Sequence, residues 1–350
     1  MICLRRMLCT HLHRTLQRNH DADVLYSDYD KIAEDGRRVE PFYKFEWSPE
    51  TLLCANIVTH LTAFRRVLLD QVGYLDSTLD GSQDWDLYLR FSETTSRFVH
   101  IPEILYHWRI MAGSVAQTMD NKPYARVAQQ RLLENALKRY GCINHTIHFD
   151  TGHPLRCVYP YVSWDFNLTS LSIIVTLDDL NNWATLRGWL QRETSSITTE
   201  FIFIVPDQRS LVSAIVEAQY DYVMVINSSL KIEPTARLAT LWQWFVRPNV
   251  GLVGGKVINR RKQIVHAGMH QTSDGDFQSY WVGQRHPIWS AYGTDCWYRN
   301  VEAVAPTLAM LPRKLVIPQL GDWWALCQYL IQQDYHIVYT PDLVAIDKSS

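Results

Sequence analysis

Leu171-Ser172-Ile173-Ile174-Val175-Thr176 is a largely apolar run whose length suits a single β-strand. Such a run is typical of a strand that is buried on both faces of a parallel sheet. Two similar runs follow at residues 201–205 and 222–226, and helical patterns separate the three. Strands that alternate with helices in this way predict a doubly wound α/β sheet, with its ligand crevice beyond the carboxyl ends of the strands.

Polar residues follow each of these strands. Asp178 comes after the first strand, Asp207 after the second and Asn227-Ser228-Ser229 after the third. Because the carboxyl ends of parallel strands meet at one edge of a sheet, we expect Asp178 and Asp207 to bind substrate there.

A sequence element built on an Asp-Trp pair occurs twice. The first copy reads Gln83-Asp84-Trp85-Asp86-Leu87-Tyr88-Leu89-Arg90 and leads to His100-Ile101-Pro102. The second copy reads Gly321-Asp322-Trp323-Trp324 and leads to Tyr339-Thr340-Pro341. From the Asp to the Pro is 18 residues in the first copy and 19 in the second. This spacing predicts one architecture carried twice.

Composition indicates an ordinary globular chain of about two domains. The net charge of −2 gives no reason to expect nucleic acid or an anionic membrane surface as partner. No apolar run approaches the roughly 20 residues of a spanning helix, so no transmembrane segment is predicted. The seven cysteines lack CxxC spacing, which favours reduced thiols in a cytoplasmic protein over a disulfide framework.

Helices are expected at several places in the first half. Residues 1–20 are basic and free of acidic residues, as in a transit peptide, but their leucine spacing favours an amphipathic helix. Ser48 and Pro49 predict a helix start. The apolar periodicity of residues 61–72 predicts a helix that Gly73 ends.

Motifs in both halves occur together in one known family. Those of the first half are Tyr26-Ser27-Asp28-Tyr29-Asp30-Lys31, Trp47-Ser48-Pro49, Gly81-Ser82-Gln83-Asp84-Trp85-Asp86-Leu87 and His100-Ile101-Pro102 to His107-Trp108-Arg109. Those of the second half are Ser172-Ile173-Ile174-Val175, Val250-Gly251-Leu252-Val253-Gly254-Gly255-Lys256, Gln263-Ile264-Val265-His266-Ala267-Gly268 and Tyr339-Thr340-Pro341. By these residues the chain resembles family 2 glycosyltransferases of O-antigen and polysaccharide assembly.

The resemblance implies an α/β fold of the GT-A type, the fold of nucleotide-diphospho-sugar transferases, with a mainly parallel central sheet. Residues 1–145 would form the C-terminal half of one such domain. Residues 146–167 would be a linker, and residues 168–350 a second, nearly complete domain with a degenerate metal motif.

The resemblance also implies a mechanism. In the family, Mg²⁺ or Mn²⁺ held by an Asp-x-Asp motif neutralises the diphosphate of a nucleotide-sugar donor, and a separate carboxylate acts as general base on the acceptor hydroxyl. Asp84 is similar to that base, and Asp322 holds the same position in the second half. Either residue could instead cap the helix that follows it. The other residues implied to bind substrate are Asp86, His107, Trp108, Arg109 and His266.

Departures from the family pattern weaken the implied metal site. The acidic motif of the second half reads Asn227-Ser228-Ser229, and Trp324 replaces the family's Asp two residues after the base. Neutral groups bind Mg²⁺ poorly, so no metal ligand is predicted in this chain. Met1 falls where the family has the helix after the metal motif, so the first domain is expected to lack half of its active site.

Two functions therefore stay open. One is a glycosyltransferase, with its activity either intact or impaired in this chain, that transfers a sugar from a nucleotide-sugar to a glycan or lipid-linked glycan in surface polysaccharide or O-antigen biosynthesis. The other is a non-catalytic carbohydrate-binding or scaffolding remnant that docks a partner glycosyltransferase. Peripheral contact with the inner membrane is also left open.

Aromatic residues near the implied acceptor region suit a carbohydrate surface, although core packing explains tryptophans equally well. They are Trp281, Trp289, Trp297, Trp323 and Trp324.

Overall fold

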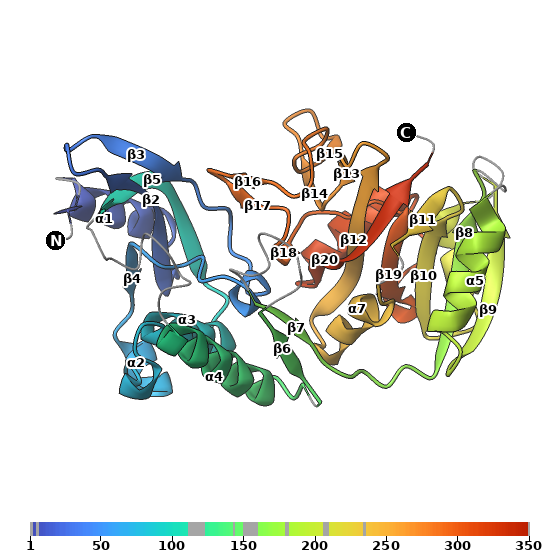
Figure 1. Ribbon diagram of the computed structural model, residues 1–350, viewed down its shortest axis with the longest axis horizontal. Coiled ribbons are helices and arrows are strands. Elements are labelled where there is room, and N and C mark those ends of the chain that lie inside the picture. Colours follow the sequence, from blue (N-terminus) through green and yellow to red (C-terminus); the bar gives the residue numbers. More distant parts are fainter. Residues whose placement is uncertain are drawn as a thin grey trace. The chain divides into compact units, whose positions relative to one another are not determined.

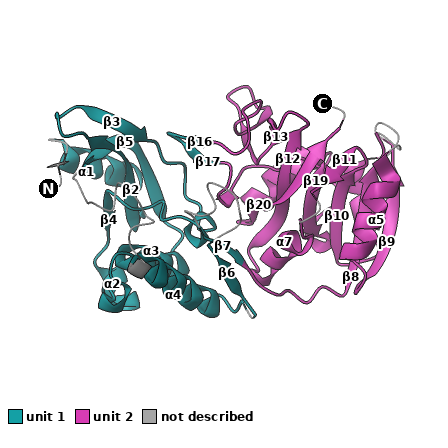
Figure 2. Ribbon diagram, viewed as in Figure 1, with its two compact units in different colours: residues 1–162, 289–294 teal, residues 163–288, 295–350 magenta. Residues whose placement is uncertain are grey.

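The chain forms two compact units, each built on its own β-sheet (Figures 1 and 2). The computed structural model describes residues 3–4, 7–110, 123–142, 144–149, 160–178, 182–205, 210–233 and 236–348. Unit 1 comprises residues 1–162 and 289–294, and unit 2 comprises residues 163–288 and 295–350. In the described ranges, no helix combines the length and the apolar character that crossing a bilayer requires.

Unit 1 is organised around strand β2 (Val24–Ile32). Strand β5 (Phe98–Arg109) runs parallel to β2 along one edge. Strands β4 (Thr62–Phe64) and β3 (Arg38–Phe42) pair antiparallel with successive parts of β2. The remaining elements are β1 (Cys3–Leu4), α1 (Leu8–Arg18), η1 (Thr51–Leu53), α2 (Val67–Val72), η2 (Ser77–Leu79), α3 (Gln83–Thr94), α4 (Pro123–Arg139), β6 (Thr146–His148) and β7 (Tyr161–Ser163), which crosses the unit boundary.

Helices near the start of unit 1 follow the predictions only in part. The amphipathic helix is α1, and its Leu8 and Leu12 pack on a small core of β2 and β5 residues. The helix expected over residues 61–72 is α2 alone, because residues 62–64 form β4 by backbone pairing with β2. Tertiary pairing overrides the local helical pattern there. The predicted start at Ser48 yields a turn and the short 3₁₀ helix η1.

Unit 2 contains the strand and helix series that the sequence predicts. Strand β8 (Ser170–Thr176) pairs parallel with β9 (Thr198–Ile204) and with β10 (Tyr222–Asn227). Helix α5 (Trp183–Glu193) lies over this part of the sheet (Figure 1). The Trp183 ring meets the rings of Phe201 and Phe203 edge-on.

The rest of this sheet is mixed, not simply parallel. Strand β19 (Leu308–Pro312) lies antiparallel between β10 and β12 (Val250–Asn259), and β12 runs parallel to β20 (His336–Asp347). A parallel strand needs a crossover, usually a helix. The chain reaches β19 through short antiparallel strands instead.

The remaining elements of the second half of the chain are α6 (Leu211–Glu217), β11 (Leu230–Ile232), α7 (Ala239–Trp242), η5 (Gln243–Val246), β13 (Ile264–His266), β14 (Met269–Gln271), β15 (Phe277–Ser279), β16 (Trp289–Ser290), β17 (Gly293–Thr294), β18 (Arg299–Asn300), η6 (Arg313–Leu315) and α8 (Trp323–Gln332).

The similarity between the two Asp-Trp copies extends to strand pairing. In unit 1, β2 is parallel to β5 and antiparallel to β4; in unit 2, β12 is parallel to β20 and antiparallel to β19. Helix α3 precedes β5, and α8 precedes β20. Both long strands shift register around their proline, Pro102 or Pro341, which has no N–H to donate to the ladder.

The tryptophan of each pair has the same structural role. Trp85 and Trp323 are each 4% exposed. The indole N–H of Trp85 donates to the Leu52 carbonyl at 2.8 Å, and that of Trp323 donates to the Val304 carbonyl at 2.7 Å. Trp85 therefore fastens α3 to η1, and Trp323 fastens α8 to an earlier loop, so this part of the repeated motif is structural.

Candidate functional site

Asp84 lies within the first turn of α3, whose N-cap is Ser82. Its Oδ2 accepts hydrogen bonds from Asn56 Nδ2 at 3.2 Å and from the Thr59 hydroxyl at 3.0 Å. Its Oδ1 accepts the next backbone N–H of the helix at 2.9 Å. The carboxylate is thus oriented by side chains of a neighbouring loop as well as by its own helix.

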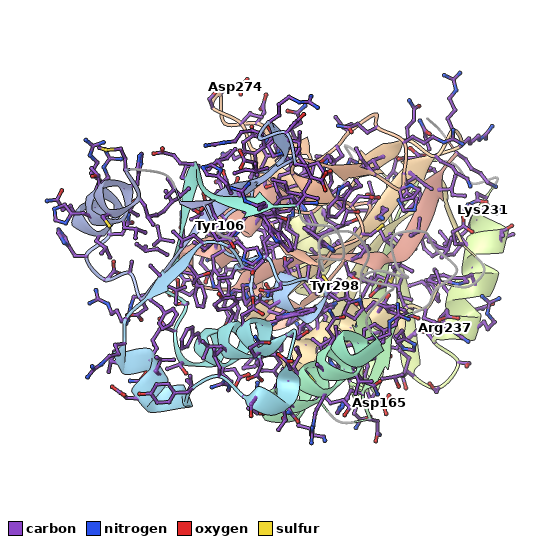
Figure 3. All side chains as sticks on the ribbon, turned by 60° about the vertical axis from the view of Figure 1, so that its left-hand side comes forward. Tyr106, Asp165, Lys231, Arg237, Asp274 and Tyr298 are labelled. Carbon is purple, nitrogen blue, oxygen red and sulfur yellow. The ribbon has the colours of Figure 1, made fainter. Side chains whose placement is uncertain are left out.

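His60 extends this arrangement to the aromatic residues of β5. Its ring stacks on Tyr106, with centroids 4.8 Å apart, and meets Trp108 edge-on, also at 4.8 Å. Figure 3 marks Tyr106 on β5. The Thr59 hydroxyl lies 3.2 Å from His60 Nδ1. Burial, reinforced by the Lys44 ammonium, lowers the pKa of His60 to about 4, so this imidazole is neutral near pH 7.

The buried Lys44 side chain binds the backbone of residues 58–60, the loop that carries Thr59 and His60. It is 5% exposed, and its Nζ donates to the carbonyl oxygens of Val58 at 3.3 Å, His60 at 3.1 Å and Thr59. Burial lowers the pKa of Lys44 to about 7, against the attraction of the Asp28 carboxylate. One buried ammonium therefore organises the carbonyl groups of the loop that carries Thr59 and His60.

Replacing Lys44 by Met is expected to raise the pKa of His60 above about 4 while leaving it below the usual 6.5. The substitution removes the charge that repels the imidazolium, and burial, the larger cause of the shift, remains. An NMR titration of the His60 ring protons measures the change.

Lys31→Met is the matched control for that titration. Lys31 pairs with Glu40 at 2.6 Å in an exposed contact and does not figure among the causes of the His60 shift. An unchanged His60 pKa in Lys44→Met would contradict the charge effect.

The stability of the folded chain should also depend on Lys44. Its folded pKa of about 7 lies below the unfolded value of about 10.4, so between these two pH values the unfolded chain binds more protons than the folded chain. The contribution of Lys44 to the free energy of unfolding therefore rises with pH between about 7 and about 10.4, and Lys44→Met should abolish this rise.

Asp86 faces away from Asp84. Residues two apart on a helix point to different sides. Asp86 is 4% exposed, and its Oδ2 accepts from the Arg90 guanidinium at 2.8 Å. Arg90 also donates to the Val72 and Gly73 carbonyl oxygens at the end of α2. Asp86 thus holds Arg90, and Arg90 joins α3 to the end of α2.

His107 lies on the opposite face of β5 from Tyr106 and Trp108, because side chains alternate along a strand. It is 1% exposed, and its Nδ1 lies 2.5 Å from Asp30 Oδ1. Its Nε2 is buried without a hydrogen-bond partner among the described residues. Arg109 shares this face by alternation. The structure therefore brings Trp108 to the surroundings of Asp84 but does not bring His107 or Arg109 there.

In unit 2, the polar residues at the carboxyl ends of β8 and β10 meet, as expected for one edge of a sheet. Asn227 Nδ2 donates to Asp178 Oδ2 at 2.5 Å, and the Asp178 backbone N–H donates to the Ser228 hydroxyl at 3.0 Å. The Asn227 side-chain oxygen accepts the Ser229 N–H at 2.8 Å. Asp207 lies outside the described residues.

This edge does not fit a divalent ion in the part of the chain that the structure describes. Mg²⁺ needs anionic oxygen ligands. The Asn227 amide donates into the Asp178 carboxylate, and the Ser229 hydroxyl donates to Asp347 at 3.2 Å. A neutral donor therefore already occupies one oxygen of each carboxylate.

Asn227→Asp is expected to create Mn²⁺ affinity, with binding on the order of tenfold tighter or more, because it places a second carboxylate beside Asp178. Calorimetric titration of MnCl₂ into both proteins measures it. Asn227→Ala is the control, since it removes the amide without adding charge. Equal Mn²⁺ affinity in the two variants would contradict this account of the edge.

Asp322 is the N-cap of α8. Its carboxylate accepts the Ala325 backbone N–H at 2.9 Å. Helix capping, the alternative weighed for this residue, is therefore a contact that the structure contains. His266 ends β13, where burial lowers its pKa against the attraction of the Asp347 carboxylate.

A second group of possible metal ligands lies within unit 2. One ligand atom each from His286, Asp295 and Cys296 falls within 4.8 Å of the others. However, Lys256 Nζ lies 2.8 Å from Asp295 Oδ2, and His286 Nδ1 lies 2.5 Å from the same oxygen. Because an ammonium already neutralises the carboxylate, the group fits a buried ion pair better than a metal ion.

The fold and these sites define an α/β chain with a loop-held carboxylate in one unit and a neutral turn at the sheet edge of the other. No protein-family model matches the chain. It is 28% identical over 326 residues to O-antigen biosynthesis protein RfbC of Myxococcus xanthus, covering 85% of this chain and 25% of that protein. It is 29% identical over 287 residues to the uncharacterized protein y4gI of Sinorhizobium fredii, covering 71% of this chain and 31% of that protein. The chain thus spans a quarter to a third of the length of the curated relatives that it matches.

Two solved structures are similar at a lower level. Mannosyltransferase PcManGT from Pyrobaculum calidifontis, in complex with GDP-Man and Mn²⁺, matches with a TM-score of 0.30 and 12% identity over 52% of this chain and 57% of its own. HddC from Yersinia pseudotuberculosis matches with a TM-score of 0.27 and 12% identity over 51% of this chain and 93% of its own.

Proposed function

We propose that this chain is part of a glycosyltransferase of surface polysaccharide assembly, which transfers a sugar from a nucleotide-sugar to a glycan or lipid-linked glycan. The observation that carries the proposal is the Asp84 carboxylate, which Asn56 and Thr59 orient beside the neutral His60. The similarity to an O-antigen biosynthesis protein over 85% of the chain supports the biological setting.

In the proposed reaction, Asp84 takes the proton of an acceptor hydroxyl. The acceptor oxygen forms a bond to the anomeric carbon of the donor, and the bond from that carbon to the nucleoside diphosphate breaks. Hydrogen bonds from Asn56 and Thr59 hold the base in one orientation, which is what a positioned general base requires. Inversion at the anomeric carbon is part of the proposal.

The remaining assignments belong to the same proposal. Unit 1 would be the acceptor half of a family 2, GT-A domain, and unit 2 a second such domain in which Asp178 and Asp207 contact substrate. The chain would act in the cytoplasm. Mg²⁺ or Mn²⁺ would neutralise the donor diphosphate in such a domain. The described residues at the sheet edge of unit 2 do not fit the ion.

A non-catalytic, carbohydrate-binding function is the second candidate. It is favoured by unit 2, where Asn227 stands at the metal position and Asp322 caps a helix. Acceptor-dependent release of nucleoside diphosphate from UDP-, GDP- or dTDP-sugars tests the two. Release that needs the acceptor supports the transferase, whereas glycan binding without release with every donor supports the second candidate.

A further inference from the structure

A hairpin from the second half of the sequence belongs to unit 1. Strands β16 and β17 pair antiparallel, and the Tyr43 backbone N–H donates to the Ala291 carbonyl at the turn at 2.7 Å. The hairpin is assigned to unit 1, although the residues before and after it, Ile288 and Asp295, are assigned to unit 2 (Figure 2). Its Ser290 hydroxyl donates to the Gly293 carbonyl and accepts the Tyr292 N–H, both at 3.1 Å, so the turn is preorganised.

Two aromatic pairs join the hairpin to unit 1. Trp289 stacks on Phe42, with centroids 6.1 Å apart, and Tyr292 stacks on Tyr43 at 5.2 Å. Trp289 is 49% exposed and Tyr292 is 61% exposed. Each pair therefore fixes the orientation of a ring that still presents about half of its surface to solvent. By contrast, Trp297 and Trp323 are buried in unit 2.

Ring contacts continue from the hairpin to the proposed base. Phe42 packs on Tyr29 at 5.3 Å, and Tyr29 meets the edges of His60 at 6.1 Å and Trp108 at 6.5 Å. His60 follows Thr59, which donates to Asp84. The exposed rings thus lie at one end of a series of side-chain contacts that ends at the carboxylate.

We propose that Trp289 and Tyr292, supported by Phe42 and Tyr43, form a platform on which pyranose rings of the acceptor glycan stack. The inference rests on the proposed function and names the place where its acceptor binds. The negative face of an aromatic ring attracts the polarised C–H groups of a sugar, and both surfaces leave water on contact. Two rings suit one or two sugar residues, whereas a stable protein interface buries about 800 Å² on each partner.

The test is glycan binding by the whole chain without any donor. A panel of defined hexose and 6-deoxyhexose oligosaccharides is the probe, with saturation-transfer NMR and tryptophan fluorescence as readouts. Trp289→Ala and Tyr292→Ala are each expected to weaken binding about tenfold, the equivalent of about 1.4 kcal/mol. Trp289→Phe should retain most of the affinity, because it keeps a ring against Phe42. Tyr74→Ala is the matched control, since Tyr74 is 69% exposed elsewhere in unit 1, and it should bind as the parent does.

Several outcomes would overturn the platform. They are a parent that binds no oligosaccharide of the panel, alanine variants that bind as tightly as the parent, and a parent dimer that the alanine variants convert to monomer. The last would make the hairpin an interface between copies. Failure of the proposed function gives a different result: glycan binding that depends on Trp289, with no sugar transfer under any donor. Asp84→Asn should keep the glycan affinity, which separates binding from chemistry.

Discussion

Asp84→Asn is expected to lower sugar-transfer turnover by about 10²- to 10⁴-fold, the usual contribution of a general base. The amide has nearly the shape of the carboxylate and can still accept the bonds from Asn56 and Thr59 through its oxygen. It cannot take the acceptor proton. Initial rates of acceptor-dependent nucleotide release, at matched folded fraction, measure the loss in any form of the chain that transfers sugar.

Asp322→Asn is the matched control, because Asp322 occupies the same position in the second Asp-Trp copy. Asn caps helices about as well as Asp, so the Ala325 N–H keeps an acceptor and turnover should change little. Asp322→Ala should cost about 1 kcal/mol of stability through the lost cap. Equal turnover of Asp84→Asn and the parent would remove Asp84 from the mechanism. A large loss in Asp322→Asn alone would place the working site in unit 2.

Lys256→Met is expected to destabilise the folded chain by about 3–5 kcal/mol, because it leaves the Asp295 carboxylate buried without its cation. Lys256 is 1% exposed and Asp295 is 0% exposed. Burial alone would raise the pKa of Asp295, but the Lys256 ammonium and the hydrogen bond from His286 hold it well below its usual range. Urea unfolding at pH 7, followed by tryptophan fluorescence, measures the loss.

The exposed ion pair of unit 1 provides the comparison. Glu40→Gln removes one partner of Lys31 and should cost at most about 1 kcal/mol, because solvent screens such pairs. Combining Lys256→Met with Asp295→Leu should recover part of the stability, since no charge is then left unpaired. The folded pKa of Asp295 is depressed, so its contribution is present above the unfolded value of about 3.9 and is lost as the pH falls further. A loss in Lys256→Met no larger than that in Glu40→Gln would contradict the buried pair.

The sequence predicted those helices and strands whose hydrophobic pattern lies within one continuous segment. The strands β8, β9 and β10 and the helix α5 follow from apolar runs and helical patterns within single segments. The prediction of a helix over residues 62–64 is wrong, because these residues form β4 by pairing with β2, a distant segment of the chain. The antiparallel position of β19 between β10 and β12 was not predicted for the same reason. The pairing of strands that are far apart in the sequence cannot be recognised from the residues of a short segment.

The candidate site was predictable only for the residue that carries a motif. Asp84 stands in the repeated Asp-Trp element, whereas Asn56, Thr59 and Lys44 come from irregular segments without any recognisable spacing. The family resemblance implies that His107, Trp108 and Arg109 at the end of β5 all bind substrate. Alternation along the strand instead sends Trp108 to one face and His107 to the other. Applying that periodicity of two to residues 106–109 would have separated them in advance.

The hairpin of residues 289–294 also bears on how this chain can be divided. Because unit 1 includes it, the boundary between the units falls at three places along the sequence: after residue 162, before residue 289 and after residue 294. A coding fragment that stops near residue 162 would encode Phe42 and Tyr43 without the rings that cover them. Exchange of the second half between related genes would replace those rings together with unit 2. We therefore expect the two units to be inherited together, and substitutions at residues 42 and 43 to be accepted only with compatible residues at 289 and 292.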